Sequence, residues 1–213
     1  MDFMELRKFS LSLNTSLGKT LIMADPHLGF ELSRGLRIRT HFEEILSEFI
    51  LLEDPDLVII LGDLKEPLGL SFEMKSILNR FFEKIRDFNV VMTKGNHDGR
   101  LEEVTSKFPN VKVVDHFLLD GLLFLHGHKQ LPSVEFFEGY LGHVHPAYTF
   151  KGVTAKKIKV FVRIGKFLIF PTINPFLEGF DIRSGIKLVP FLREAKNADL
   201  FLPEGTYIGR IEL

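Results

Sequence analysis

The first half of the chain alternates short, continuous apolar runs with stretches whose apolar residues recur every three or four positions. Three runs have the length and composition of buried strands, at residues 20–24, 57–61 and 90–93. A helical stripe lies in each gap between them: Ile38, Phe42, Ile45, Leu46 and Phe49 in the first, and Met74, Ile77, Leu78, Phe81 and Ile85 in the second. Ser71 can cap the second helix. This β-α-β-α-β order predicts parallel strands.

The second half is richer in strand patterns than in helical ones. A short helix is expected at residues 100–108, and strands are expected at residues 122–125, 140–141, 157–164 and 167–170. A sheet-rich half folded against a βαβ half predicts an α/β (α+β) fold in which two β-sheets pack face to face with helices outside. No repeat, low-complexity tract or Gly/Ser linker divides residues 1–213, so we predict a single domain.

Composition narrows the chemistry before any motif is considered. The 213 residues include no cysteine, which excludes disulfides, thiolate nucleophiles and zinc sites built on sulfur, so metal ligands must be nitrogen or oxygen atoms. The net charge of −1 gives no global basic field for nucleic acid, although a local basic patch is invisible in that sum. The first residues lack a signal-peptide core, and the apolar stretch at residues 160–173 is interrupted by two cations, so we expect a cytoplasmic protein with no membrane partner.

Polar residues follow the predicted strands at their carboxyl ends, where ligands gather in sheets of this kind. The five strand exits read DPH at residues 25–27, GD at 62–63, GNHD at 95–98, HGH at 126–128 and GHVH at 142–145. Six of the eight histidines lie in these five turns. Glycines in or beside the turns let the backbone bend sharply or approach a ligand closely. The pattern predicts that the five turns assemble one ligand site.

Each signal also has a purely structural interpretation. The alternatives are N-caps for Asp25 and Asp63, surface turn residues for His143 and His145, a core histidine for His126, a left-handed turn for Asn96 and a helix cap for Asp98. Taken together, these alternatives require six independent accidents of histidine placement. The shared site is therefore the favoured interpretation of the set.

The order D-x-H, G-D, G-N-H-D, H-G-H, G-H-x-H resembles the signature of the calcineurin-like metallophosphoesterases over residues 25–145. The strings DPHLG, GDLK and GHVHP, followed by PTINPFLEGFD at residues 171–181, further resemble the small stand-alone DNA-ligase-associated or repair-nuclease-like phosphoesterases. The resemblance implies two mixed sheets packed as a sandwich flanked by helices. By family position, residues 171–181 are expected near the site, although their Pro and Gly are also ordinary loop chemistry.

The resemblance also implies two divalent metal ions. One would be held by Asp25, His27, Asp63 and His145, and the other by Asp63, Asn96, His126 and His143. Asp63 would bridge both ions, because a carboxylate offers two oxygens. Manganese is the favoured metal, with iron, zinc, cobalt and nickel as alternatives for this nitrogen and oxygen donor set. Two cations about 3.5–4 Å apart lower the pKa of a shared water and clamp the attacking and leaving oxygens.

The remaining polar residues are assigned to catalysis and substrate binding. His97 is expected to protonate the leaving oxygen or stabilise transition-state charge, and Asp98 to orient the His97 ring and raise its pKa. Asn96, His128 and Arg34 are the expected substrate contacts. Arg34 and three further cations (Arg39, Lys65 and Lys94) could contact phosphate or could be solvated surface charges.

The predicted function is hydrolysis of phosphodiesters, of nucleic-acid or cyclic-nucleotide type, by a hydroxide that bridges the two metals. The expected partner is therefore a phosphate-ester substrate, with DNA or RNA as candidates, and no pattern specifies an oligomeric state. Two alternatives stay open: a phosphomonoesterase for a small metabolite, and a metal-bound interaction scaffold without turnover. Scaffold relatives usually lack ligands, whereas all seven expected ligands are present here.

Overall fold

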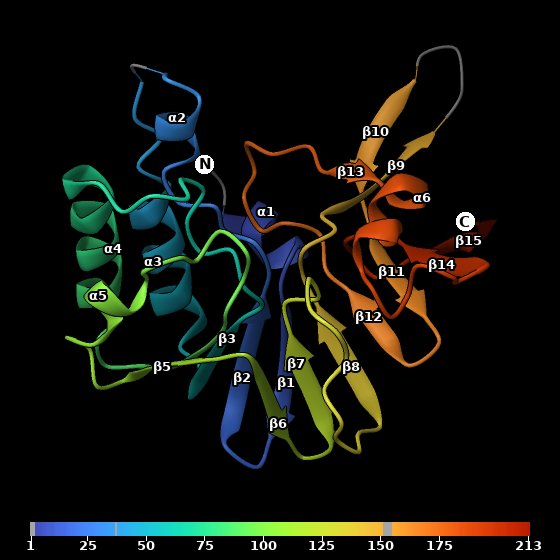
Figure 1. Ribbon diagram of the computed structural model, residues 1–213, viewed down its shortest axis with the longest axis horizontal. Helices are drawn as coiled ribbons and strands as arrows, with labels where there is room; N and C mark the ends of the chain where they lie inside the picture. The colour runs from blue at the N-terminus through green and yellow to red at the C-terminus, as the bar shows by residue number, and fades with distance from the viewer. Residues whose placement is uncertain (1–2, 37, 151–154) are drawn as a thin grey trace.

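The computed structural model describes residues 3–36, 38–150 and 155–213, and a five-stranded sheet runs through its N-terminal half (Figure 1). The sheet order is β1-β2-β3-β4-β5, with bounds β1 (Leu11–Thr15), β2 (Gly18–Met23), β3 (Leu57–Ile60), β4 (Asn89–Thr93) and β5 (Val111–Val114). Strands β2 to β5 are parallel, and β1 pairs antiparallel with β2. The predicted parallel β-α-β-α-β arrangement is confirmed.

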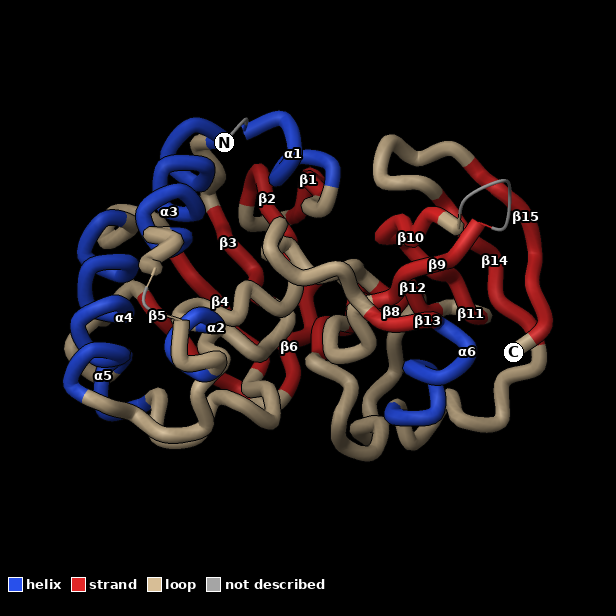
Figure 2. Tube along the Cα trace, turned by 90° about the horizontal axis from the view of Figure 1, so that it is seen from above, coloured by secondary structure: helices blue, strands red, loops and turns tan. Residues whose placement is uncertain are grey.

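Helices cover one face of this sheet (Figure 2). They are α1 (Phe3–Lys8), α3 (Phe42–Glu53), α4 (Phe72–Lys84) and α5 (Glu102–Thr105). Ser71 caps α4 as predicted, since its Oγ accepts the Met74 N–H at 3.1 Å. The placement of Ile38 in the α3 stripe was wrong: it precedes the helix and is 79% exposed. The backbone N–H of Thr40, which precedes α3, donates to Glu31 of α2 (Phe30–Ser33) at 3.2 Å. This bond holds the chain before α3 in a non-helical position.

Alternate residues of the central strands enter two different cores. Leu21 and Met23 of β2 pack toward the helices, whereas Ile22 and the following Ala24 pack toward a second sheet. Strand β3 divides its side chains in the same way. Because successive strand residues point to opposite faces, burial on both faces requires the continuous apolar runs seen in the sequence.

The second sheet has seven strands in the order β15-β14-β11-β12-β8-β7-β6. Their bounds are β6 (His116–Leu119), β7 (Leu122–Leu125), β8 (Glu138–Leu141), β11 (Phe161–Ile164), β12 (Phe167–Ile169), β14 (Asn197–Phe201) and β15 (Tyr207–Glu212). Aromatic side chains fill the space against the first sheet, with Phe124 and Tyr140 stacked at 5.2 Å between ring centroids. Its other face packs against α6 (Ile182–Gly185) and the 3-10 turn η1 (Ile186–Leu188). The predicted sandwich of mixed sheets flanked by helices is confirmed.

A small third sheet, in the order β10-β9-β13, was not expected. It contains β9 (Pro146–Phe150), β10 (Lys156–Lys159) and β13 (Phe180–Asp181). The predicted single strand at residues 157–164 was wrong, because the chain leaves β10 at Val160 and enters the seven-stranded sheet as β11. The predicted helix at residues 100–108 is shorter, limited to α5. Among the described residues, no helix combines the length and apolar character that a bilayer crossing demands.

Candidate metal centre

One group of donors joins the exit of β2 to the turn between β8 and β9. The Nε2 atoms of His27 and His145 lie 2.9 Å apart, and His145 Nε2 is 3.4 Å from Asp25 Oδ2. All three residues are buried, and one donor atom from each lies within 4.8 Å of the others. Two imidazole nitrogens that face each other this closely need a proton or a cation between them, since their lone pairs otherwise repel.

A second group of donors surrounds His126, which follows β7. Its Nε2 lies 3.3 Å from Asp63 Oδ2, 3.2 Å from Asn96 Oδ1 and 3.1 Å from His143 Nδ1. The four residues come from the turns after β3, β4, β7 and β8. Asp63, His126 and His143 have donor atoms within 4.8 Å of one another, so they could hold an ion together.

Asp63 joins the two groups. Its Oδ2 is 3.9 Å from His27 Nε2 in the first group and 3.3 Å from His126 Nε2 in the second. The seven residues named from the sequence as metal ligands therefore lie together, although they come from five turns spread between Asp25 and His145. This convergence is the geometric condition that a dinuclear site must satisfy.

Backbone and carboxylate contacts fix the orientation of the candidate ligands. His126 Nδ1–H donates to the Leu61 carbonyl at 2.9 Å, which directs Nε2 toward the other donors of the second group. The His143 N–H donates to both oxygens of Asp25, at 3.1 and 2.9 Å. Metal-binding histidines generally depend on such outer contacts for their tautomer and ring position.

Three glycines provide the space that the candidate ligands occupy. A Cβ at Gly62 would collide with the His126 ring, and a Cβ at Gly95 would collide with the Asp63 carboxylate and backbone nitrogen. A Cβ at Gly142 would collide with the Leu61 carbonyl and lie 2.9 Å from Asp25 Oδ2. These glycines are required for close approach, as the sequence pattern predicted.

The acidic and basic groups of the centre shift one another's pKa values. Burial alone would lower the pKa of His126, but its contact with Asp63 and the nearby Asp25 raise it to about 9. Burial, together with the neighbouring His126, lowers the pKa of His143 to about 4. Burial opposes ionisation of Asp63, yet its contacts with His126 and His27 lower its pKa below the ordinary value. Imidazoles and carboxylates in this arrangement fit divalent metals that accept nitrogen and oxygen ligands, and such a metal would displace the shared protons.

Glu66 is a site residue that the motif analysis missed. Its Oε2 lies 2.5 Å from His27 Nδ1, and its backbone carbonyl accepts from His97 Nδ1 at 2.8 Å. A carboxylate behind a metal-binding imidazole is a common second contact in metal centres. Glu66 stands three residues after Asp63 in the same strand exit, which is the sequence signal that could have identified it.

The expected contact between Asp98 and the His97 ring is not formed. Asp98 is fully buried, and its two oxygens accept the backbone N–H groups of Leu64 and Gly95, each at 2.9 Å. Burial raises the pKa of Asp98, with a further contribution from the charge of Asp63. Asp98 therefore holds the turns after β3 and β4 together, while the ring of His97 is oriented by Glu66. The role assigned to Asp98 was wrong because a carboxylate next to a histidine in sequence can point away from its ring.

The segment after β12 forms hydrogen bonds to the backbone of the first donor group. Thr172 Oγ1 donates to the Asp25 carbonyl at 2.7 Å, and Asn174 Nδ2 donates to the Pro26 carbonyl at 2.8 Å. Both side chains are fully buried. Lys159 in turn donates to the carbonyls of Thr172 and Asn174, at 3.1 and 2.5 Å. Residues 171–181 thus lie beside the site, as the family position implied.

A cavity of about 740 Å³ opens over the first donor group. Its polar lining comes from His27, Arg34, Glu66, His97, His145, Lys157 and Glu178, and its apolar lining from Phe30, Leu36, Phe176, Leu177, Gly179 and Phe180. Arg34, a predicted substrate contact, and His97 therefore line the same cavity. A second hollow of about 190 Å³ lies on the His126 side.

Of the other residues considered for substrate contact, His128 lines a hollow, whereas three cations already bind other groups of the protein. His128 lines the smaller hollow, where burial and the nearby His126 lower its pKa to about 4. Lys65 is buried, and its ammonium donates to the carbonyls of Pro67, Leu68 and His97. Arg39 and Lys94 form ion pairs with Glu73 and Glu102. Lys65, Arg39 and Lys94 are therefore structural charges.

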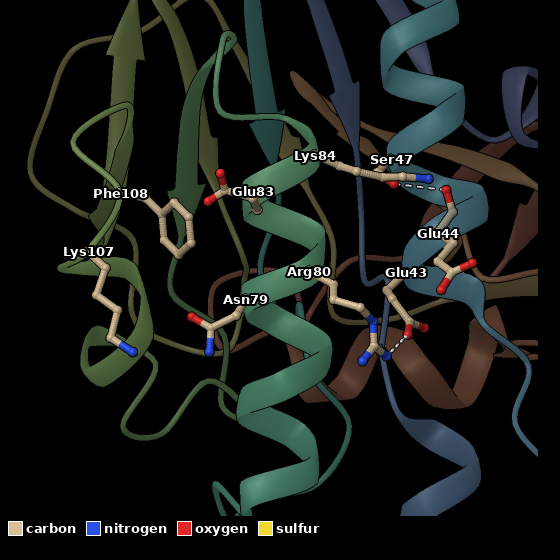
Figure 3. A pocket seen from close by; sticks show the side chains of 9 residues that line it. All are labelled: Glu43, Glu44, Ser47, Asn79, Arg80, Glu83, Lys84, Lys107 and Phe108. Carbon is tan, nitrogen blue, oxygen red and sulfur yellow. Dashed lines mark hydrogen bonds and ion pairs between the residues drawn. The ribbon is translucent and has the colours of Figure 1, made fainter.

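A hollow of about 810 Å³ lies elsewhere, beside α3 and α4 (Figure 3). Its lining is mainly charged: Glu43, Glu44, Ser47, Asn79, Arg80, Glu83, Lys84, Lys107 and Phe108. Arg80 points to Glu43 and forms an ion pair with it. It contains none of the candidate metal ligands, so size alone does not identify the site.

Comparisons with solved structures concern the fold. The crystal structure of the Pseudomonas putida nuclease MPE superimposes with a TM-score of 0.70 at 20% identity, covering 95% of this chain and 92% of that one. That likeness supports the fold. The structure of YfcE, a phosphoesterase from E. coli, gives a TM-score of 0.42 at 15% identity, covering 91% of this chain and 98% of that one, and adds no further argument.

The sequence comparison assigns the family. No protein with a curated description matches the chain. The model of the calcineurin-like phosphoesterases matches residues 18–162, which is more than half of the chain and includes the five turns of the site. This chain belongs to the calcineurin-like phosphoesterases and is a metal-dependent hydrolase of phosphoric ester bonds.

Proposed function

We propose that this hydrolase is a phosphodiesterase that uses two divalent cations, with nucleic-acid or cyclic-nucleotide diesters as substrates. The observation that carries the proposal is Asp63 Oδ2, which lies within 4 Å of a histidine from each donor group. Asp25, His27, Asp63 and His145 would hold one cation, and Asp63, Asn96, His126 and His143 the other. When bound, such a pair lowers the pKa of a water nucleophile and offsets the negative charge of the phosphate.

His97 is the residue to which we assign proton transfer at the leaving oxygen. Its Nδ1–H donates to the Glu66 carbonyl at 2.8 Å, which fixes the ring and leaves Nε2 as the atom that can exchange a proton with substrate. The His97 ring lines the 740 Å³ cavity, and its side chain is 28% exposed. The backbone N–H of His97 donates to Asp63 Oδ1 at 2.8 Å, which fixes His97 relative to the carboxylate that would bridge the two cations.

The cavity favours a diester over a monoester. A phosphomonoester carries two negative charges at neutral pH and usually needs several cationic side chains besides the metals, whereas Arg34 and Lys157 are the cationic side chains that line this cavity. Much of the remaining lining is apolar, which suits a second ester group. A monoesterase is the alternative function, because the same donor set could hydrolyse a smaller phosphate.

A metal-bound scaffold without turnover is the other alternative. All seven candidate ligands are present and converge, and His97 is exposed to the cavity rather than sealed behind it. A scaffold has no need for an exposed proton donor beside its metals. These features favour catalysis.

The test compares three substrates with the full chain loaded separately with manganese, iron, zinc, cobalt or nickel. Manganese is expected to give the highest turnover, and bis-(p-nitrophenyl) phosphate is expected to be hydrolysed at least about tenfold faster than the monoester, with single-stranded DNA also cleaved. A preference for the monoester would support the alternative enzyme. Full metal occupancy with no hydrolysis of any substrate would support the scaffold.

Two variants separate metal binding from proton transfer. His97→Ala is expected to keep its metal content and lose about 100-fold or more in kcat, the range typical of a lost general acid. His145→Ala is expected to lose metal, measured by elemental analysis after dialysis. Unchanged kcat in His97→Ala would remove the catalytic role.

A further inference from the structure

We propose that Phe176 and Phe180 form a base-binding wall beside the metal centre, against which an unpaired nucleobase of the substrate stacks. This inference rests on the proposed phosphodiesterase function and names the chemical group that the cavity selects. Both rings line the 740 Å³ cavity together with His97 and His145. They are 41% and 59% exposed, although phenylalanine is normally a core residue.

Phe176 is held rigidly although one side of it is open. Its ring stacks on Phe30 at 5.6 Å with an interplanar angle of 18°, and the buried Phe42 meets it edge-on at 6.2 Å. Its backbone N–H donates to Asn174 Oδ1 at 3.0 Å. A fixed aromatic face binds a planar ligand with little loss of side-chain entropy.

Phe180 is tied to a candidate metal ligand. Its backbone N–H donates to the His145 carbonyl at 2.8 Å, and its ring centroid is 6.0 Å from that of His145. Gly179, directly before it, has φ +81° and no space for a Cβ beside the His145 carbonyl. The position of the Phe180 ring relative to the first donor group is therefore set by close backbone packing.

The charges around the two rings fit a nucleotide rather than an apolar ligand. Arg34 and Lys157 line the same cavity, and neither side chain forms an ion pair with any residue that the structure describes. Two carboxylates line the cavity. Glu66 contacts His27, whereas Glu178 forms no ion pair with any residue that the structure describes. Aromatic faces combined with cations are the usual surface for unpaired bases and their phosphates.

A base already stacked in a duplex cannot offer its face to Phe176 or Phe180. A small sugar phosphate could use the cations but would leave both rings in contact with water. The two rings therefore select for unpaired bases of any identity, because every nucleobase has a face that can stack.

The experiment uses the manganese-loaded full chain and two oligonucleotides of equal length, one of thymidylate and one of abasic tetrahydrofuran units. Both carry the same phosphodiester backbone, so they differ in the bases alone. Wild type is expected to show at least about tenfold higher kcat/KM on oligothymidylate, mainly through a lower KM. Phe180→Ala and Phe176→Ala are each expected to lose about tenfold on oligothymidylate and to keep the abasic rate. Phe180→Tyr should retain the preference.

Phe137→Ala is the matched control, because Phe137 is 82% exposed and does not line the cavity, and it should change neither rate. Equal wild-type rates on the two strands would overturn the wall and leave the phosphodiesterase intact. An equal loss on both strands in Phe180→Ala would show a structural role and would also overturn the wall. Failure of wild type on every diester would overturn the proposed function itself.

Discussion

Backbone strain is concentrated at the candidate ligands. Nine described residues other than glycine have left-handed backbone, and five of them belong to the metal centre: Asp25, His27, Asp63, His143 and His145. Each such residue costs of order 1–3 kcal/mol and persists where neighbouring contacts hold it. The Thr172 hydroxyl on the Asp25 carbonyl and the His27 N–H on the Asp63 carbonyl, at 2.9 Å, are two of these contacts. The free energy of folding therefore offsets the cost of holding these donor residues in strained backbone conformations.

Gly95→Ala is expected to weaken metal binding by about tenfold or more. The added methyl group would displace Asp63, the residue that joins both donor groups. Manganese titration and kcat/KM measure the effect. Gly69→Ala is the matched control, because a methyl group added at Gly69 would meet no atom within 4 Å, and its metal affinity should equal that of wild type. Equal affinity of the two variants would show that Asp63 can move without loss of the site.

The sequence predicted which donors converge but not how their rings are oriented. The seven candidate ligands could be named from the turns and the family resemblance, because polar residues gather at the carboxyl ends of strands, here in two sheets that pack together. Glu66 and Asp98 could not, because their roles depend on where a side chain points after a turn. Asp98 bonds backbone N–H groups of Leu64 and Gly95, and no residue spacing encodes that direction.

At the scale of elements, the segment after β12 bonds directly to the backbone of the candidate site. It contributes no metal ligand, yet Thr172 and Asn174 bond the carbonyls of Asp25 and Pro26. Residues of the last third of the chain therefore fix the geometry of the first strand exit.

Thr172→Val is expected to reduce the free energy of unfolding by about 1–3 kcal/mol and to lower metal affinity. The change keeps the shape of the side chain but leaves the buried Asp25 carbonyl and Asn174 N–H without their partner. Urea unfolding and manganese titration measure the two effects. Thr105→Val is the control, because Thr105 is buried on α5 and its hydroxyl donates to the Leu101 carbonyl, at 3.4 Å, rather than to the backbone of a candidate ligand. Normal metal affinity in Thr172→Val would contradict the positioning role.

Element boundaries were predicted less well than element types. The strands β2, β3 and β4 were visible because both of their faces are buried. The break at Val160 was not, since residues 157–164 form one strand-like run whose two parts pair with β9 and with β12 and β14. Pairing partners are decided by tertiary contacts that a single strand pattern does not contain.

Across the whole molecule, Lys159 links the small sheet to the segment that supports the site. It is 9% exposed, contacts the Phe9 ring at 4.6 Å, and bonds the carbonyls of Thr172 and Asn174. Burial lowers the pKa of Lys159 to about 7. The folded state therefore releases this proton at a lower pH than the unfolded chain does.

The contribution of Lys159 to stability is expected to rise with pH between about 7 and 10, because the unfolded chain binds one more proton at Lys159 over that range. The slope of the unfolding free energy should exceed that of Lys159→Met by up to about 1.4 kcal/mol per pH unit. Urea unfolding of the metal-free chain at several pH values measures both slopes. Lys156→Met, at an exposed neighbouring position, should keep the wild-type slope. Parallel slopes for wild type and Lys159→Met would contradict the lowered pKa.

The order of the donors along the chain has a consequence for synthesis. A polypeptide that has left the ribosome only as far as residue 140 already contains Asp25, His27, Asp63, Asn96 and His126. It lacks His143, His145 and the Thr172 and Asn174 side chains that hold the first strand exit in place. The nascent protein at that length therefore cannot yet bring all seven candidate ligands together, and the full set assembles only after most of the chain has been translated.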